Sequence, residues 1–363
     1  MIAAIPSPSL KEELRAQFVL DRLALLNVEK SIDTYGNILV RLYSAKHASA
    51  GPLLFFTDLG TSRWHSVHSL SQLDATTARG AGLADVLGTA SLLSLIEGII
   101  TGRIINNTDV MFLFSAHSFD DPKIDAFEYI VNNHNTHPSA ALGVQGFSLG
   151  SIVTSLEGNY QLEIKAVSPI LADENEDPEK KKPVLQPDNL VIDALVEISR
   201  NLSSLTWDDD DTTHCYIRRI EGGTGFGAIP SEGVLDIEID SGDANLLESA
   251  LKLVESIVEK IRGESDLTFE IKVVSHIPAG VSSINDELTK QIVEIMKDLH
   301  IKVKEKSGSD PAAFLINNGI PSLSLGVSKG RVGLEHDVIN IDSVEKGRQL
   351  LEQITGKLFK EKT

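Results

Sequence analysis

The fold class is decided by the stretch Ile220-Glu-Gly-Gly-Thr-Gly-Phe-Gly-Ala-Ile-Pro230, followed by Leu235-Asp-Ile-Glu-Ile-Asp240. Apolar and polar residues alternate with period two on both sides of the glycine-rich segment. Such alternation predicts two strands with one face buried and one face in solvent, joined through the glycines.

Alternating strands also flank this pair, at Tyr160–Ala166 and Thr268–Val274. Helical spacing predicts a helix between each outer strand and the central pair, at residues 189–205 and 245–262. The resulting order is strand-helix-strand-strand-helix-strand, which predicts a small split βαβ sandwich of the ferredoxin-like kind.

The chain around this sandwich has a different pattern. Short, continuously apolar runs predict strands buried on both faces, and they alternate with helical segments, which indicates an α/β domain with a mixed, mostly parallel sheet. The same pattern resumes after the sandwich, so we expect a discontinuous α/β domain of residues 1–155 and 278–363 with residues 156–277 inserted. The predicted strands are Pro52–Phe56, Val110–Phe114 and Pro321–Gly326, and the predicted helices are 10–27, 90–100, 124–132, 286–299 and 311–318.

Composition excludes several classes of function. Thirty-three basic against 52 acidic residues give a formal net charge of -19, which repels phosphate backbones and anionic membranes. We therefore expect no nucleic acid and no membrane partner. The N-terminal residues lack the basic segment of a secretory signal, so we expect a cytoplasmic protein. Cys215 is the only cysteine, so any metal site would have to use histidines and carboxylates.

The predicted architecture resembles the dizinc hydrolase family of peptidase T, aminoacylase and carboxypeptidase. The glycine-rich stretch quoted above is similar to that family's lid. Ile5-Pro-Ser-Pro-Ser9, with Glu12 and Arg15 in the next helix, is similar to its N-terminal segment, and Ser307-Gly-Ser-Asp-Pro311 to its serine-aspartate loop. The resemblance implies a zinc-exopeptidase domain with an inserted lid that forms a homodimer, and a short peptide or N-acyl amino acid as ligand.

The resemblance also implies a set of metal ligands, most of which are missing here. The family uses a His-x-Asp pair, a bridging aspartate, a glutamate pair whose first member is the general base, a further carboxylate and a C-terminal histidine. His336 stands at the last position. At the His-x-Asp position, one register leaves Asp58 as the aspartate, and another puts Thr57 and Leu59 at the two ligand positions.

The remaining positions are equally incomplete. Asp85 is the only carboxylate near the bridging position, where an ungapped alignment puts Ala84, and Asp85 also suits the start of a helix. The glutamate pair falls on Ser118 and Phe119 by counting. A two-residue deletion would bring Asp120 and Asp121 into the catalytic pair instead. Gln145 stands where a further carboxylate is expected, and the lid lacks the family's histidine.

Three hypotheses follow for the function. We favour a catalytically inactive homologue with a degenerate dizinc site that still binds a peptide or amino-acid derivative, because catalytic groups act as a unit. The second is an active zinc-dependent exopeptidase or amidohydrolase with displaced ligands. The third is a non-enzymatic protein that dimerises through its lid. Displaced ligands for the second hypothesis are available at His65, His68 and His117, with Asp120 and Asp121 beside them.

Overall fold

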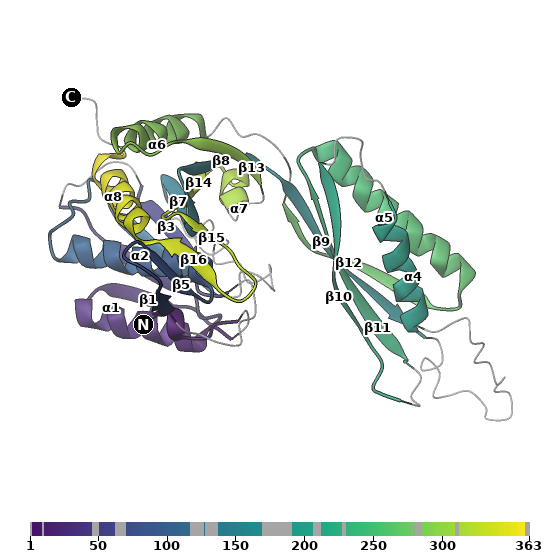
Figure 1. Cartoon of the computed structure of the whole chain (residues 1–363). Helices are drawn as coiled ribbons and strands as arrows, with labels where there is room; N and C mark the ends of the chain where they lie inside the picture. The colour runs from purple at the N-terminus through teal and green to yellow at the C-terminus, as the bar shows by residue number, and fades with distance from the viewer. Residues whose placement is uncertain are drawn as a thin grey trace. The chain divides into compact units, whose positions relative to one another are not determined.

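The structure, a computed structural model, describes residues 2–8, 11–45, 51–61, 70–116, 127, 137–168, 191–205, 212–226, 230–277, 279, 285–308 and 312–359. The chain forms two compact units (Figure 1). The first consists of Met1–Ser155 and Val281–Thr363, and the second of Leu156–Gly280.

The first unit is built on an eight-stranded mixed sheet. Its inner strands β6, β3, β7 and β14 are mutually parallel, and β1 and β2 continue it in antiparallel fashion. All six residues of β6 are buried, as are the first five of β3, which is typical of strands covered on both faces. The expected mixed, mostly parallel sheet is therefore confirmed. The strands, in sheet order, are β1 (Glu29–Ile32), β2 (Ile38–Leu42), β6 (Val110–Ser115), β3 (Leu53–Asp58), β7 (Ala140–Leu149), β14 (Ser322–Gly326), β8 (Ser151–Leu156) and β13 (Lys304–Gly308).

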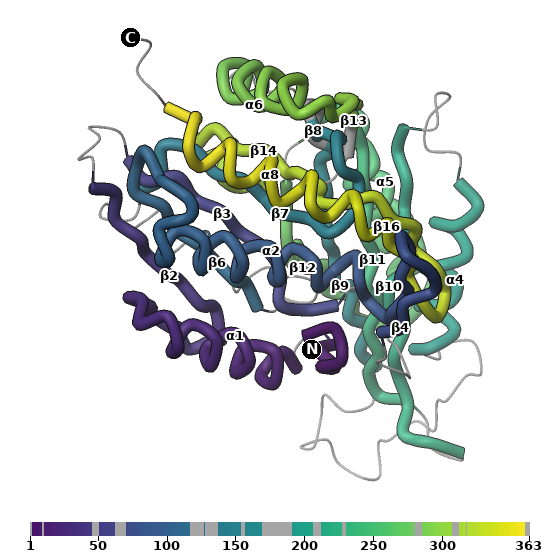
Figure 2. The backbone as a smooth tube through the Cα atoms, turned by 60° about the vertical axis from the view of Figure 1, so that its left-hand side comes forward, coloured from purple at the N-terminus to yellow at the C-terminus, as the bar shows by residue number. Residues whose placement is uncertain are grey.

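A row of helices packs beside this sheet (Figure 2). Helix α2 lies on β3 and β7, with α1 on one side of it and α8 on the other, and α6 packs against α8. Helix α2 begins seven residues before the predicted 90–100, so Asp85 lies in its first turn. The helices of this unit are η1 (Ile2–Ala4), α1 (Glu13–Leu26), α2 (Leu83–Ile100), α6 (Asp286–Asp298), α7 (Ala312–Asn317) and α8 (Ile341–Lys357).

Helix α2 is mostly apolar, and its only charged residues are Asp85 and Glu97. It is the one helix in the described ranges that is long and apolar enough to cross a membrane. Its contacts with β3, β7, α1 and α8 account for this composition, because a helix covered on several sides loses its polar face. We therefore interpret α2 as the core helix of the α/β unit.

A second, four-stranded antiparallel sheet belongs to the same unit. It joins residues from distant parts of the chain, since β5 pairs with β16. Its strands, in order, are β15 (Gly330–Arg331), β16 (Asp337–Asn340), β5 (Thr77–Gly80) and β4 (Leu70–Gln72).

The second unit has the predicted strand-helix-strand-strand-helix-strand order. Its four antiparallel strands are arranged β10-β11-β9-β12, and α4 and α5 bury their apolar residues in one core with the inward residues of the sheet. Gly223 and Gly225, after β10, have φ angles of 79° and 140°, which explains the glycines there. The elements are β9 (Gly158–Val167), α4 (Val191–Ser203), β10 (Thr213–Gly222), β11 (Glu232–Ser241), α5 (Ala244–Glu264) and β12 (Thr268–Ile277).

Gly88 allows α2 to approach the sheet. A Cβ atom at this position would lie 2.2 Å from Thr57 Oγ1 and 2.3 Å from the Val144 carbonyl oxygen. Such contacts are far inside van der Waals distance, and one of them is with the backbone of β7. The helix can therefore occupy this position only with glycine at its point of contact.

We predict that Gly88→Ala lowers the free energy of unfolding by about 3 kcal/mol through overpacking. The matched control is Gly263→Ala in α5, where a Cβ would meet nothing within 4 Å. That substitution should raise stability by roughly 0.5–1 kcal/mol, because alanine favours the helix over glycine. Urea unfolding of both variants provides the measurement, and equal effects would contradict the packing described.

Candidate functional site

The expected ligand Asp58 is held by groups of the protein. It ends β3, directly opposite Ser115 at the end of the parallel strand β6. The Ser115 hydroxyl donates a 2.9 Å hydrogen bond to Asp58 Oδ1, and the Thr89 hydroxyl of α2 donates a 3.0 Å bond to the Asp58 carbonyl oxygen. One carboxylate oxygen of Asp58 thus has a protein donor.

Asp85 lies in the first turn of α2, where the partial positive charge at the helix N-terminus stabilises a carboxylate. Its Oδ2 atom is buried. The sequence left open whether Asp85 marks a metal-bridging position or the start of a helix. The structure establishes the helix start, and the bridging role stays a prediction.

A buried arginine of α1 binds the backbone of the loop that follows β3. Arg15 is 1 % exposed, and its guanidinium donates to the carbonyl oxygens of Leu59 at 2.6 Å, Gly60 at 3.4 Å and Ile5 at 3.0 Å. Burial lowers the pKa of Arg15 to about 10, while the negative charges of Asp85 and Glu12 act to raise it. The side chain therefore carries its positive charge at neutral pH and interacts electrostatically with both carboxylates.

Sequence reasoning noted Arg15 only as a landmark and missed this position. A signal was present, because Arg15, Val19 and Leu23 recur at intervals of four residues and share the buried face of α1. A charged residue on an apolar helix face must find partners inside the protein.

The third expected ligand, His336, comes just before β16 and is half-buried. Its Nδ1 atom is buried and has no hydrogen-bond partner among the described residues. The adjacent Asp337 is fully buried, and its carboxylate accepts hydrogen bonds from the backbone N–H groups of Ala84 at 3.0 Å and Gly333 at 3.2 Å. Asp337 thereby holds the turn that contains His336 against the first turn of α2.

The end of β7 completes this region. A Cβ atom on Gly146 would lie 2.2 Å from the Ala84 carbonyl oxygen, so the strand touches the first turn of α2 through backbone atoms. Gln145, at the position where a further carboxylate ligand was expected, is exposed. The structure thus brings the sequence positions around 59, 85, 146 and 337 together.

Among the described residues, the expected positions do not supply the ligands of a dinuclear metal centre. Within the described ranges, no three His, Cys, Asp or Glu side chains are grouped so that they could hold a metal ion. A catalytic zinc usually has three protein ligands. The other predicted ligands His65, His68 and His117, and the predicted catalytic pair Asp120 and Asp121, lie outside the described residues.

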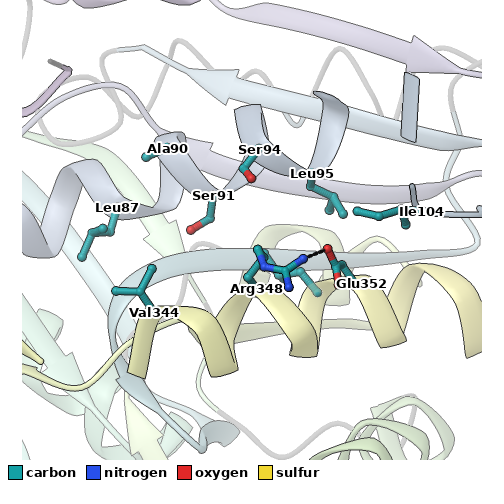
Figure 3. A pocket seen from close by; sticks show the side chains of 10 residues that line it. Leu87, Ala90, Ser91, Ser94, Leu95, Ile104, Val344, Arg348 and Glu352 are labelled. Atoms are coloured by element: carbon teal, nitrogen blue, oxygen red, sulfur yellow. Dashed lines mark hydrogen bonds and ion pairs between the residues drawn. The ribbon is translucent and has the colours of Figure 1, made fainter. Parts of the chain in front are cut away.

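An apolar pocket of about 120 Å³ lies elsewhere in this unit, between α2 and α8 (Figure 3). It contains none of the expected site residues. Arg348 is the only cation that lines it, and Glu345 and Glu352 both accept hydrogen bonds from its guanidinium. The polar side chains that line this mostly apolar pocket are Ser91, Ser94 and the paired Arg348 and Glu352.

The fold is that of the dinuclear metal-dependent exopeptidases, and it covers both units. No family model and no curated protein matches the sequence. Among the similar solved structures is aminopeptidase PepT of Bacillus cereus, with 16% identity, a TM-score of 0.70 and coverage of 99% of this chain and 96% of that chain. The YXEP protein of Bacillus subtilis, a dinuclear metal-binding peptidase of the M20 family, has 14% identity, a TM-score of 0.60 and coverage of 98% of this chain and 94% of that chain. A hydantoinase/carbamoylase family amidase of Burkholderia vietnamiensis has 13% identity, a TM-score of 0.71 and coverage of 98% and 92%. The resemblance inferred from the sequence is confirmed as a fold.

We predict that Asp337→Ala destabilises the α/β unit by about 2–4 kcal/mol, because it removes a buried carboxylate that accepts two charge-assisted hydrogen bonds from part-buried backbone N–H groups. Hydrogen exchange at the Ala84 amide should accelerate in the variant. The control is Asp342→Ala, at an exposed aspartate in the first turn of α8, with an expected change within about 0.5 kcal/mol. An unchanged exchange rate at Ala84 would show that the Asp337 bond is not formed in solution.

Proposed function

We propose that this chain is a cytoplasmic, catalytically inactive homologue of the dinuclear exopeptidases, and that it binds a short peptide or amino-acid derivative without hydrolysing it. The observation that carries the proposal is that protein groups occupy the surroundings of both expected carboxylate ligands. Asp58 accepts a hydrogen bond from Ser115, and Asp85 interacts electrostatically with the buried Arg15. Both carboxylates are thus partly neutralised or satisfied from within the chain.

The chemistry of peptide hydrolysis explains why this matters. In the dinuclear enzymes, two metal ions acidify a bridging water and stabilise the charge that develops on the attacked carbonyl. The catalytic groups act as a unit, so the loss of one member removes nearly all activity. His336 lacks two further ligands nearby in the described ranges, and Gln145 is a neutral amide that binds zinc poorly.

We predict that the purified protein takes up less than one equivalent of zinc and that His336→Ala leaves this amount unchanged. Elemental analysis and calorimetric titration at neutral pH provide the measurement. The Bacillus subtilis YXEP protein, a dinuclear metal-binding peptidase, is the positive control, and His300→Ala, at an exposed histidine, controls for non-specific binding. Two tightly bound zinc ions that disappear in His336→Ala would instead establish the displaced-ligand hydrolase.

We also propose that the chain forms a homodimer through its lid. The outer strands β10 and β12 of the lid sheet are each ten residues long, and each presents an exposed large side chain, Tyr216 and Val273. Long edge strands favour pairing with a second copy. Sedimentation velocity over a range of concentrations should show a dimer. A monomer that persists at the highest concentration would contradict this proposal.

A further inference from the structure

Three lysines follow one edge of the eight-stranded sheet. Lys302 precedes β13, and Lys304 and Lys306 lie within it, so the three are spaced two residues apart and share one face of the extended chain. All three side chains are exposed. The intervening Val303 packs against the core of the α/β unit, so the lysines lie on the opposite face. We call Lys302, Lys304 and Lys306 the lysine stripe.

The stripe is a local excess of positive charge on an acidic protein. The whole chain has a formal net charge of -19. Asp298, at the end of α6, is the nearest acidic residue before the stripe in the sequence, and its carboxylate is already paired with the ammonium group of Lys357 at 3.1 Å. Glu305 lies between two of the lysines in the sequence and belongs to the other face of the strand. Within the described ranges, no ion pair neutralises a lysine of the stripe.

The backbone of β13 is open along the same edge. β13 is the last strand of the sheet, and among the described strands only β8 is its neighbour. The Lys304 amide donates a 2.8 Å hydrogen bond to the Gly150 carbonyl oxygen, and a Cβ on Gly150 would lie 2.3 Å from the Lys302 carbonyl oxygen. The backbone groups of both lysines therefore point into the sheet. Those of Val303 and Glu305, one residue out of phase, point to the open edge.

We propose that the edge of β13 binds an extended acidic peptide segment of another protein, which joins the sheet as a further strand. The backbone of the segment pairs with the open edge, and its carboxylates, two residues apart, meet the lysine stripe. Binding by strand addition gains affinity from main-chain hydrogen bonds and specificity from alternate side chains. This surface lies outside the candidate site, so the inference goes beyond the proposed function and does not depend on it.

A nucleic acid or an anionic membrane fits this surface less well. Both are polyanions that extend far beyond three lysines, so they also meet the negative potential of the rest of the chain. Neither has peptide N–H and C=O groups in the spacing of a β-strand. A short acidic peptide meets only the stripe and the open edge, and it can use both.

Lysines on an edge strand also have a purely structural explanation. Charged side chains there prevent two copies of a protein from pairing edge to edge. On this explanation, replacing the lysines leads to self-association, and the wild-type chain binds no acidic peptide. The two explanations thus make opposite predictions for peptide binding by the wild-type chain.

The experiment measures the fluorescence anisotropy of a dye-labelled peptide of alternating glutamate and valine residues, titrated with the full chain at low ionic strength. A second peptide has proline in place of every valine. It keeps the charge and an extended backbone but lacks the N–H groups that pair with the strand edge. Comparison of the two peptides therefore separates strand addition from simple charge attraction.

Two variants of the full chain complete the test. The stripe variant has glutamine at all three positions of the lysine stripe. The control variant combines Lys11→Gln, Lys252→Gln and Lys260→Gln, at exposed lysines elsewhere, and changes the net charge by the same amount. The wild-type chain and the control variant should bind the glutamate–valine peptide equally. The stripe variant should bind it about tenfold more weakly, as expected for the loss of three exposed charge pairs, and the wild-type chain should bind the proline peptide more weakly by a similar factor.

No saturable binding by the wild-type chain, or equal binding by the stripe variant, would overturn the proposal. Equal binding of both peptides would show charge attraction without strand addition and would overturn it too. Self-association of the stripe variant in sedimentation velocity, with no peptide bound by the wild-type chain, would establish the structural explanation. Displacement of the peptide by single-stranded RNA or by phosphatidylserine vesicles, at lower concentrations than by unlabelled peptide, would assign the stripe to a polyanion instead.

Discussion

The backbone contact between α2 and strands β3 and β7 positions everything else in the candidate site. Gly88 lets the helix lie directly on the two strands, so its first turn reaches the carboxyl ends of the parallel sheet. Ligand sites of open α/β sheets form at those ends, because parallel strands direct their following loops to one edge. The same turn then meets Gly146 of β7 and Asp337 of β16, which explains how residues from distant parts of the chain converge.

The described side chains that converge there are bound by other groups of the protein. A dinuclear site needs several carboxylates around two cations, and the remaining carboxylates here have protein partners. Ser115 donates to Asp58, backbone N–H groups donate to Asp337, and Arg15 interacts electrostatically with Asp85. The chain thus has the fold of the exopeptidases, and internal hydrogen bonds hold the carboxylates at its candidate site. The fold alone does not define an activity.

Much of the fold could be predicted from the sequence, because it depends on periodic patterns. The alternation in 160–166, 235–240 and 268–274 gave the antiparallel lid, and the continuous apolar runs at 52–56 and 110–114 gave the parallel strands. The early start of α2 was missed, because its apolar residues cover the whole helix and no polar face marks its beginning.

The site was less predictable, since it depends on contacts between distant residues. Asp85 and His336 could be chosen from the resemblance, but nothing local shows that Asp337 holds the start of α2 or that Arg15 interacts electrostatically with Asp85. The position of Arg15 on the apolar face of α1 was the one available signal. This position predicts that Arg15 is buried, but it does not predict which residues Arg15 contacts.

The central claim is that this chain binds no pair of metal ions at the candidate site. The most direct measurement is X-ray diffraction from crystals grown with zinc, with anomalous data collected at the zinc absorption edge. The account predicts electron density for the Arg15 guanidinium at the carbonyl oxygens of Leu59 and Ile5, and no anomalous peak near Asp58, Asp85 or His336. Two anomalous peaks about 3.5–4 Å apart at these residues would contradict it.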